Sequence, residues 1–428
     1  VIMSGLFKNH TYGRPVIGYG KHLKNPSMVN ILNFFKTYYV PNNMALFLSG
    51  DIDYDKTITL VDKYFGSRTP SQSIPERKFE TEAPLAKPIV AEVVGPRAEN
   101  IVIGYRVGGA TSSDATMMDI ITQLLNNYQA GLIDLNLVQK QKILKGYCWA
   151  QMLKDYGVMQ VGGTPREGQK LEEVKDLLLG EIEKIKKGEF DDWMLEAIVN
   201  NLRLQQISQL ESNYRIYALM DCFVNGKSWA NELNKFNEME TITKQQVIDF
   251  AKKNLGENYV CVYKRMGKND IAENIAKPPI TNININRNDE SAFLKDFKNI
   301  SASKLEPVFV DFENVIQKDS LQAGIPFYYI KNKTNELFNA YYILDMGKEH
   351  DKKLALAVQY LKFLGTSKYS PEQLKKELYK LAINLGVYTS EDRSYIYLYG
   401  IDKSLEKSVE LLEHLLAEVK PDKEIYNE

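Results

Sequence analysis

Cysteine and histidine are scarce in this chain of 428 residues, and their scarcity narrows its chemistry. The three cysteines, Cys148, Cys222 and Cys261, are too few and too odd in number for a disulfide framework, and none forms a C-x-x-C pair. Each lies among apolar neighbours, so we predict buried, unreactive thiols. None of the four histidines has a second histidine three to five residues away, which excludes a two-histidine zinc helix within the sequence.

Surplus charge and long apolar runs are also absent. Lys and Arg total 54 and Asp and Glu total 55, so the net charge of −1 gives no basis for binding nucleic acid. The longest apolar stretches, such as Val40 to Leu48, are broken well short of the ~20 residues needed to cross a bilayer. The composition, 44% hydrophobic and 25% charged, is that of an ordinary globular protein. The length predicts about three domains.

The first segment, residues 1–66, ends in a predicted helix–strand–helix unit. Apolar residues repeat at helical intervals from Met28 to Tyr38, and Met44 to Ser49 has the pattern of a short buried strand. A second helix follows around Ile58 to Phe65. Residues 67–88 are rich in Pro, Ser and charge, and we predict that they form a linker.

The second segment, residues 89–266, is predicted to be a complete unit of strands followed by helices. It closes with a helix at Val247 to Leu255 and a strand at Tyr259 to Tyr263, which copies the ending at Ile31 to Leu48 and indicates an internal duplication. A sheet with a helical layer, made more than once, is an α+β architecture. The earlier strands are predicted at Ile89–Val94, Asn100–Val107, Tyr147–Leu153 and Val158–Val161.

A second linker is predicted at residues 267–300, where the alternation from Ile280 to Asn286 fits either an edge strand or an extended linker. The third segment, residues 301–428, is predicted to be a partial unit that opens with a hairpin of Phe327–Ile330 and Asn339–Leu344. A capping box at Ser370 starts one helix. Two strands, at Gly386–Thr389 and Tyr395–Tyr399, then lead to a final helix at Leu405–Val419, on which Leu412, Leu415 and Leu416 are predicted to face the core and His414 the solvent.

No complete active site of a common class is visible in these residues, which contain neither a P-loop nor a G-x-S-x-G elbow. Three stretches nevertheless resemble the pitrilysin/insulinase-type zinc metallopeptidases, a family that includes mitochondrial processing peptidase. His10 to Gly18 is similar to the H-P-x-G-x-P-(I/V)-(I/L)-G loop of that family. Phe35 to Asp51 is similar to its F-x-x-x-Y-x-P-x-N-x-x-L…G-D signature. Gly365 to Asp392 is similar to its G-T…T-S-x-D stretch.

The resemblance implies a tandem protein of related α+β units, each an antiparallel sheet backed by helices. This chain would hold the end of the first unit, all of the second and part of an inactive third. The family's H-x-x-E-H zinc motif would then precede Val1, so the zinc of the parent enzyme would be bound upstream and none in this fragment. The corresponding positions in the third unit are Gln359, Lys362 and Phe363, and Phe cannot bind zinc.

The family also has an Arg and a Tyr, seven residues apart, that contact substrate. The matching positions here are Lys140 and Tyr147, which the resemblance implies are substrate-binding residues. Lys keeps the positive charge of Arg but loses its two-pronged geometry. The alternative is that these residues are a solvated Lys and a sheet-edge Tyr.

These patterns lead to the hypothesis of a fragment of a tandem zinc metalloendopeptidase that degrades peptides or unfolded polypeptides in a closed chamber. The chain itself would be inactive. Its partners would be the substrate and the remaining units of the parent protein, and the parent could also form a dimer. The rival hypothesis is a wholly inactive paralogue that binds peptides or supports a partner subunit. The resemblance favours a periplasmic location, whereas the small number of cysteines also fits a cytoplasmic protein.

Overall fold

The computed structural model describes residues 1–212, 215–268, 285–302, 304, 306–361, 363–423 and 426. The chain divides into two compact units. The larger unit comprises Val1–Tyr19, Pro26–Ala272 and Glu336–Glu428, and the smaller comprises Gly20–Asn25 and Glu273–Asn335. The unit boundaries inferred from the sequence remain predictions.

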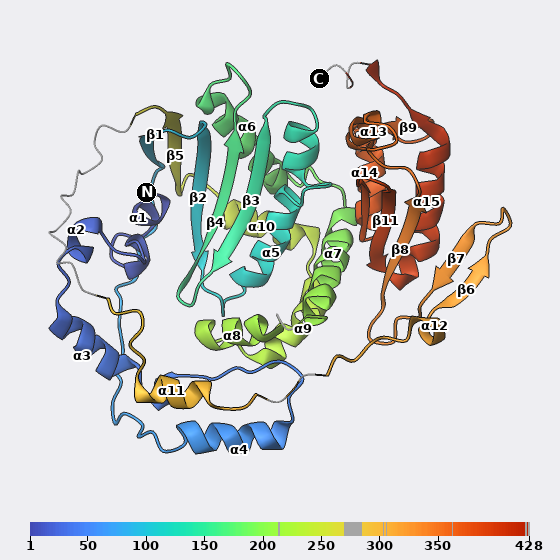
Figure 1. Ribbon diagram of the computed structural model, residues 1–428. Helices are drawn as coiled ribbons and strands as arrows, with labels where there is room; N and C mark the ends of the chain where they lie inside the picture. The colour runs from blue at the N-terminus through green and yellow to red at the C-terminus, as the bar shows by residue number, and fades with distance from the viewer. Residues whose placement is uncertain are drawn as a thin grey trace. The chain divides into compact units, whose positions relative to one another are not determined.

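A five-stranded sheet with the order β1-β5-β2-β4-β3 forms the centre of the larger unit (Figure 1). The pair β1–β5 is parallel and the other three pairs are antiparallel, with Ile103 of β2 opposite Cys261 of β5 and Val161 of β4. The β3–β4 hairpin predicted from the sequence is present. The strands are β1 (Ile89–Gly95), β2 (Asn100–Gly108), β3 (Lys145–Met152), β4 (Tyr156–Thr164) and β5 (Tyr259–Met266).

Helices cover one face of this sheet because alternate strand residues on that face are apolar. Ile103 and Tyr105 of β2 are fully buried in one core with Leu124 and Leu178 from the helices. Figure 1 shows α6 and α10 behind the strands. The segments are α5 (Asp114–Leu125), the π-helix η3 (Asp134–Val138), α6 (Leu171–Lys187), α7 (Trp193–Leu210), α8 (Arg215–Asn225), α9 (Trp229–Glu240) and α10 (Lys244–Asn254).

A second sheet, of three antiparallel strands in the order β10-β11-β8, lies later in the same unit. The capping box predicted at Ser370 is confirmed, because its Oγ accepts the Gln373 N–H at 3.2 Å and Gln373 Oε1 accepts the Ser370 N–H at 2.9 Å. The segments are β8 (Leu337–Leu344), α13 (Lys353–Leu361), β9 (Gly365–Thr366), α14 (Pro371–Lys380), β10 (Ile383–Thr389), β11 (Ser394–Ile401), η4 (Asp402–Ser404), α15 (Leu405–Glu418) and β12 (Val419–Lys420), which pairs with β9.

The two sheets share one plan. The chain order β2, β3, β4 gives the sheet order β2-β4-β3, and the chain order β8, β10, β11 gives β8-β11-β10 in the same way. In both, a helix follows the first strand and another follows the hairpin. The predicted α+β class and repeated unit are therefore confirmed.

Two residues of the last helix, Leu416 and His414, lie in environments that differ from the predicted ones. Leu411, Leu412 and Leu415 are buried, whereas Leu416, expected in the core, is 39% exposed. His414 is half-buried, with Nε2 2.9 Å from Thr366 Oγ1, because the adjacent β9 loop covers that side of α15.

The predicted strand at Met44 to Ser49 does not form. The flanking helices are present, but Met44 to Leu48 has no regular structure and no ladder partner among the described residues, and a lone strand has nothing to pair its backbone groups. The apolar faces of α3 and α4 contain no buried residue. The segments here are α1 (Ile2–Leu6), η1 (Thr11–Gly13), α3 (Met28–Tyr38), η2 (Pro41–Asn43) and α4 (Tyr54–Phe65).

The smaller unit contains the helices α2 (Gly20–Leu23), α11 (Ala292–Lys298) and α12 (Phe312–Val315) and the hairpin of β6 (Gln317–Ser320) with β7 (Pro326–Tyr329). The predicted hairpin of Phe327–Ile330 with Asn339–Leu344 is therefore wrong. The short turn at Gly324, with φ of 72°, closes β6 on β7 at a lower entropic cost, and β8 pairs with β11 instead. The alternation at Ile280 to Asn286 falls largely outside the described residues.

The three thiols are buried as predicted. Burial raises the pKa of Cys261 to about 11 and also raises the pKa values of Cys148 and Cys222, so little thiolate exists at neutral pH. Among the described residues, no helix has the length and apolar character that a bilayer crossing requires.

A buried polar cluster holds the start of the chain to the central sheet. Glu82 Oε1 accepts the backbone N–H groups of Asn9 and His10, both at 2.7 Å, and its other oxygen lies 3.5 Å from the Arg106 guanidinium. Although burial acts to raise the pKa of Glu82, the N–H groups of His10 and its neighbours outweigh it and hold that pKa below its usual value. His10 itself is buried, with Nε2 3.4 Å from Asp155 Oδ2.

Acid should therefore loosen this attachment. Because the folded-state pKa of Glu82 lies below the unfolded value of about 4.5, its carboxylate stabilises the fold fully above pH 4.5, and this contribution is lost as pH falls through the folded pKa. The substitution Glu82→Gln should lower the free energy of unfolding at pH 7 and flatten its decline below pH 4.5. Denaturant titrations at several pH values measure both effects. The exposed neighbour Glu80→Gln is the matched control, and an equal flattening there would contradict the assignment.

Candidate functional site: the edge strand β3

The strand β3 is an edge of the central sheet, since β4 is its only ladder partner among the described residues. The Cys148 N–H points away from β4, because it donates to Asn126 Oδ1 at 3.4 Å. Backbone groups of a strand alternate in direction, so the N–H and C=O of Ala150 face the same free edge. An extended peptide could add to this edge through main-chain hydrogen bonds.

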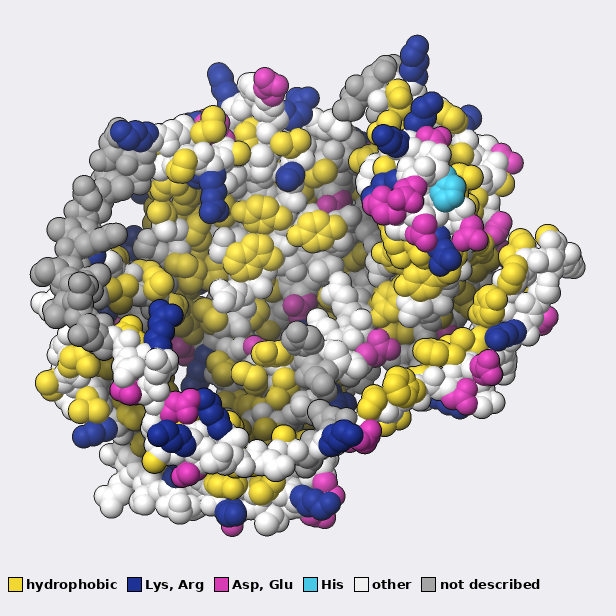
Figure 2. Space-filling view, in the orientation of Figure 1, with side chains coloured by type: hydrophobic (Ala, Val, Ile, Leu, Met, Phe, Trp, Pro, Cys, Tyr) yellow, Lys and Arg dark blue, Asp and Glu magenta, His cyan; other side chains and the backbone are white. Residues whose placement is uncertain are grey.

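Tyr147 lies on the sheet face opposite α5 to α10, where α1 packs against β2 and β5. We call the part of this face around Tyr147 the uncovered face. Its ring packs over Gly162, its cross-strand partner on β4, so closely that a Cβ on that glycine would lie 2.3 Å from the ring. Burial raises the pKa of the Tyr147 hydroxyl, which stays protonated at neutral pH and can donate a hydrogen bond. Figure 2 shows hydrophobic side chains gathered on this face of the sheet.

Lys140, the other residue expected to contact substrate, is exposed in the turn between η3 and β3. The next residue, Gln141, has a φ of 54°, a left-handed conformation that marks a sharp change in chain direction. The structure thus places Lys140 and Tyr147 on one continuous turn and strand. Their role in binding substrate remains a prediction.

The loop before β3 is organised by Asp134, which the sequence analysis did not single out. Its carboxylate accepts hydrogen bonds from Asn126 Nδ2 at 2.5 Å and from the N–H groups of Asn127 and Gly131 at 2.9 and 3.1 Å. Burial raises the pKa of Asp134, and these hydrogen bonds oppose the rise. Asn126 also accepts the outward Cys148 N–H, so Asp134 fixes the position of the residue that contacts the free edge of β3. The one signal in the sequence was an Asp within an apolar run.

The helix α14 and strand β10 contact this loop. Lys375 Nζ donates to Gln139 Oε1, Asn201 Nδ2 donates to the Tyr379 carbonyl at 2.8 Å, and Gln129 Nε2 donates to Asn384 Oδ1 at 3.2 Å. Burial lowers the pKa of Lys375, and the nearby Asp134 opposes this change. The central sheet with its helices and the three-stranded sheet are therefore joined beside the edge strand by these polar contacts and by a buried apolar cluster of Leu204, Leu337, Ala382 and Ile401.

The positions that resemble a degenerate zinc motif lie at the end of α13. Gln359 is exposed on the helix and Phe363 is exposed in the turn after it, whereas Lys362 falls outside the described residues. Within the described parts of the chain, no group of three His, Cys, Asp or Glu residues is arranged to hold a metal ion. The buried His10 does not fit zinc either, since among the described residues Asp155 is the one carboxylate paired with its Nε2.

Comparisons with known proteins agree with this architecture. A family model described as the Peptidase M16 inactive domain matches residues 29–202. The zinc protease PqqE of Helicobacter pylori is 26% identical over 216 residues, which cover 49% of this chain and 48% of that protein. The chain thus spans about half the length of this curated relative.

Solved structures share the fold. A protease from Helicobacter pylori superposes with a TM-score of 0.57 at 22% identity, covering 61% of this chain and 64% of that one. The periplasmic protease PqqL from Escherichia coli superposes with a TM-score of 0.50 at 14% identity, covering 97% of this chain and 49% of its own.

Adding a methyl group at Gly162 should displace the Tyr147 ring. We expect Gly162→Ala to destabilise the protein by about 1–3 kcal/mol through overpacking. The ring is the obstacle, so Gly162→Ala should cost markedly less in a Tyr147→Ala background. Gly180→Ala, at a helical glycine with open space around it, should instead stabilise by about 0.5–1 kcal/mol. Chemical denaturation of the four variants tests this, and additive costs for Gly162→Ala and Tyr147→Ala would contradict it.

Proposed function

Because this chain belongs to the pitrilysin-like M16 peptidase family, we propose that it supplies non-catalytic, substrate-enclosing units of a zinc metalloendopeptidase. The substrates would be peptides or unfolded polypeptides, degraded in a closed chamber formed with the remaining units of the parent protein. The match to an inactive-domain model supports a non-catalytic role. The zinc proteases among its relatives support zinc in the family.

The free edge of β3 is the observation that carries this proposal. Its outward backbone groups at Ala150 would pair with an extended substrate, and Tyr147 would lie under the substrate side chains on the uncovered face. Lys140 would supply a positive donor at the start of the strand. Main-chain pairing favours unfolded chains, because a folded protein has no free backbone to offer.

The zinc would be held by residues outside these 428. A Glu beside that metal would activate the attacking water, and the role of this chain would be to hold the substrate strand extended. We propose a periplasmic location, since the similar protease PqqL from Escherichia coli is periplasmic. The proposal also includes that the parent protein forms a dimer.

The rival function, a wholly inactive paralogue that binds peptides or supports a partner, predicts the same edge strand. The sequence of the parent gene distinguishes these two functions. On a domain size of about 200 residues, we expect the region encoding the residues before Val1 to contain H-x-x-E-H. Apolar residues at those positions would favour the inactive paralogue.

The edge strand can be tested in the chain itself. A fluorescently labelled, reduced and carboxymethylated protein should bind, and the same protein in its native, folded state should not. Ala150→Pro removes one outward N–H without touching the β4 ladder, so binding should weaken at least fivefold, equivalent to about 1 kcal/mol. Fluorescence anisotropy measures the dissociation constants.

The role of the Lys140 charge in binding is tested by comparing Lys140 with a second exposed lysine. Lys140→Ala should weaken binding of the same probe, whereas Lys187→Ala, at an exposed site on α6, should not. Thermal unfolding checks that each variant is folded. Equal binding by wild type and Ala150→Pro would contradict the proposed role of β3 in binding the substrate.

A further inference from the structure

The segment that leads into β3 has an unusual backbone conformation. The π-helix η3 (Asp134–Val138) belongs to a rare helix type, and the turn after it places Gln141 at a φ of 54°. Such conformations persist only where surrounding contacts hold them in place. Lys140, the exposed residue proposed to contact substrate, lies between these two features. The contacts that hold η3 therefore decide where Lys140 and the start of β3 lie.

Two side chains hold η3, one at each end. Asp134, its first residue, accepts three hydrogen bonds from residues 126–131. At the other end, Gln139 donates its N–H to the Asp134 carbonyl at 2.8 Å, and its Oε1 accepts a hydrogen bond from Lys375 Nζ. The charges of Lys375 and Asp134 are also close enough to interact. The first contact is local, whereas Lys375 comes from α14, 236 residues after Gln139.

The helix α14 is itself firmly packed against the helices of the central sheet. Tyr379, one turn after Lys375, is 2% exposed and lies in the same apolar core as α5 and α6. Its carbonyl accepts a hydrogen bond from Asn201 of α7 at 2.8 Å. Lys376 adds an ion pair near the start of α7, with Nζ 3.5 Å from Asp191 Oδ2. Residues four apart share a helix face, so the burial of Tyr379 also directs Lys375 toward the central sheet.

Backbone hydrogen bonds connect η3 to the start of β3. The Lys142 N–H donates to the Leu137 carbonyl of η3 at 2.7 Å, and the Leu144 N–H donates to the Thr164 carbonyl of β4 at 3.0 Å. The turn that contains Lys140 is thus bonded to η3 on one side and to the sheet on the other. A shift of η3 would therefore displace Lys140 and the first residues of β3.

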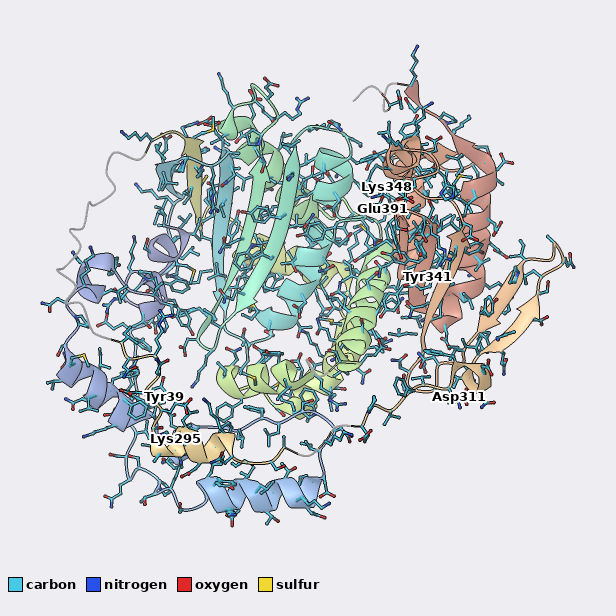
Figure 3. The ribbon with its side chains drawn as sticks, in the orientation of Figure 1. Tyr39, Lys295, Asp311, Tyr341, Lys348 and Glu391 are labelled. Atoms are coloured by element: carbon cyan, nitrogen blue, oxygen red, sulfur yellow. The ribbon has the colours of Figure 1, made fainter. Side chains whose placement is uncertain are left out.

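We propose that Lys375 is a positioning residue for the free edge of β3, because by holding Gln139 it fixes η3 and the turn that carries Lys140. Through Lys375, the three-stranded sheet sets the geometry of an edge that belongs to the central sheet. Lys348, by contrast, pairs with Glu391 at 2.6 Å within the loops of the three-stranded sheet (Figure 3). The inference rests on the proposed function, since it concerns the same edge.

Hydrogen exchange of the full chain tests the placement of η3 without any ligand. Lys375→Met removes the donor and its charge and keeps the apolar stem. The amides of Gln139, Gln141 and Lys142 close η3 and its turn, and we expect them to exchange at least fivefold faster in this variant, with α7 and α14 unchanged. Lys376→Met removes the neighbouring ion pair on the same helix and is the matched control, which should leave the three amides unchanged.

Binding of the fluorescently labelled, reduced and carboxymethylated protein tests the consequence for the edge. Lys375→Met should weaken binding at least threefold, whereas Lys376→Met should bind as wild type does. Because Lys375 acts on the edge through Gln139, the losses caused by Lys375→Met and Gln139→Ala should not add. The double variant should bind about as weakly as either single variant. Thermal unfolding checks that every variant is folded.

Three results would overturn the inference. These are unchanged exchange of the three amides in Lys375→Met, additive losses of binding for Lys375→Met and Gln139→Ala, and faster exchange throughout α7 and α14. The last result would mean that Lys375 docks the three-stranded sheet as a whole. A wild type that fails to bind the carboxymethylated protein would contradict the proposed function, and the exchange result would still decide whether Lys375 fixes η3.

Discussion

Every backbone N–H and C=O of a strand must find a partner, and this requirement decides which parts of the molecule are closed and which are open. In the central sheet β5 pairs with β2 on its second side, so β2 has a ladder partner on both edges. The same sheet leaves β3 with one free side. Met44–Leu48 also has no ladder partner among the described residues. The proposed binding edge on β3 is a consequence of this constraint.

The free side of β3 is usable because the loop beside it is held firmly. Asp134 gathers Asn126, Asn127 and Gly131, and Asn126 in turn caps the Cys148 N–H. The cap covers one backbone donor, and the next outward position along the strand is Ala150. The Tyr147 ring, which lies on Gly162, stiffens the uncovered face. A rigid edge loses less conformational entropy when a peptide pairs with it.

Local patterns predicted much of the fold. The helical repeat from Met28 to Tyr38, the capping box at Ser370 and the β3–β4 hairpin were all readable, because neighbouring residues determine them. The failures involved distant partners. Met44–Ser49 has the pattern of a strand but no sheet to join, and Asn339–Leu344 pairs with a strand some fifty residues away rather than with its neighbour. Tyr147 was predicted as a site residue from family resemblance alone, whereas the role of Asp134 depends on hydrogen bonds that no spacing reveals.

Hydrogen exchange followed by mass spectrometry tests the central claim most directly. The account predicts that an unfolded polypeptide slows amide exchange in Lys145–Met152, at the outward-facing positions of β3, while β1 and β5 are unchanged. Slowed exchange confined to other elements, with β3 unaffected at saturating polypeptide, would contradict it.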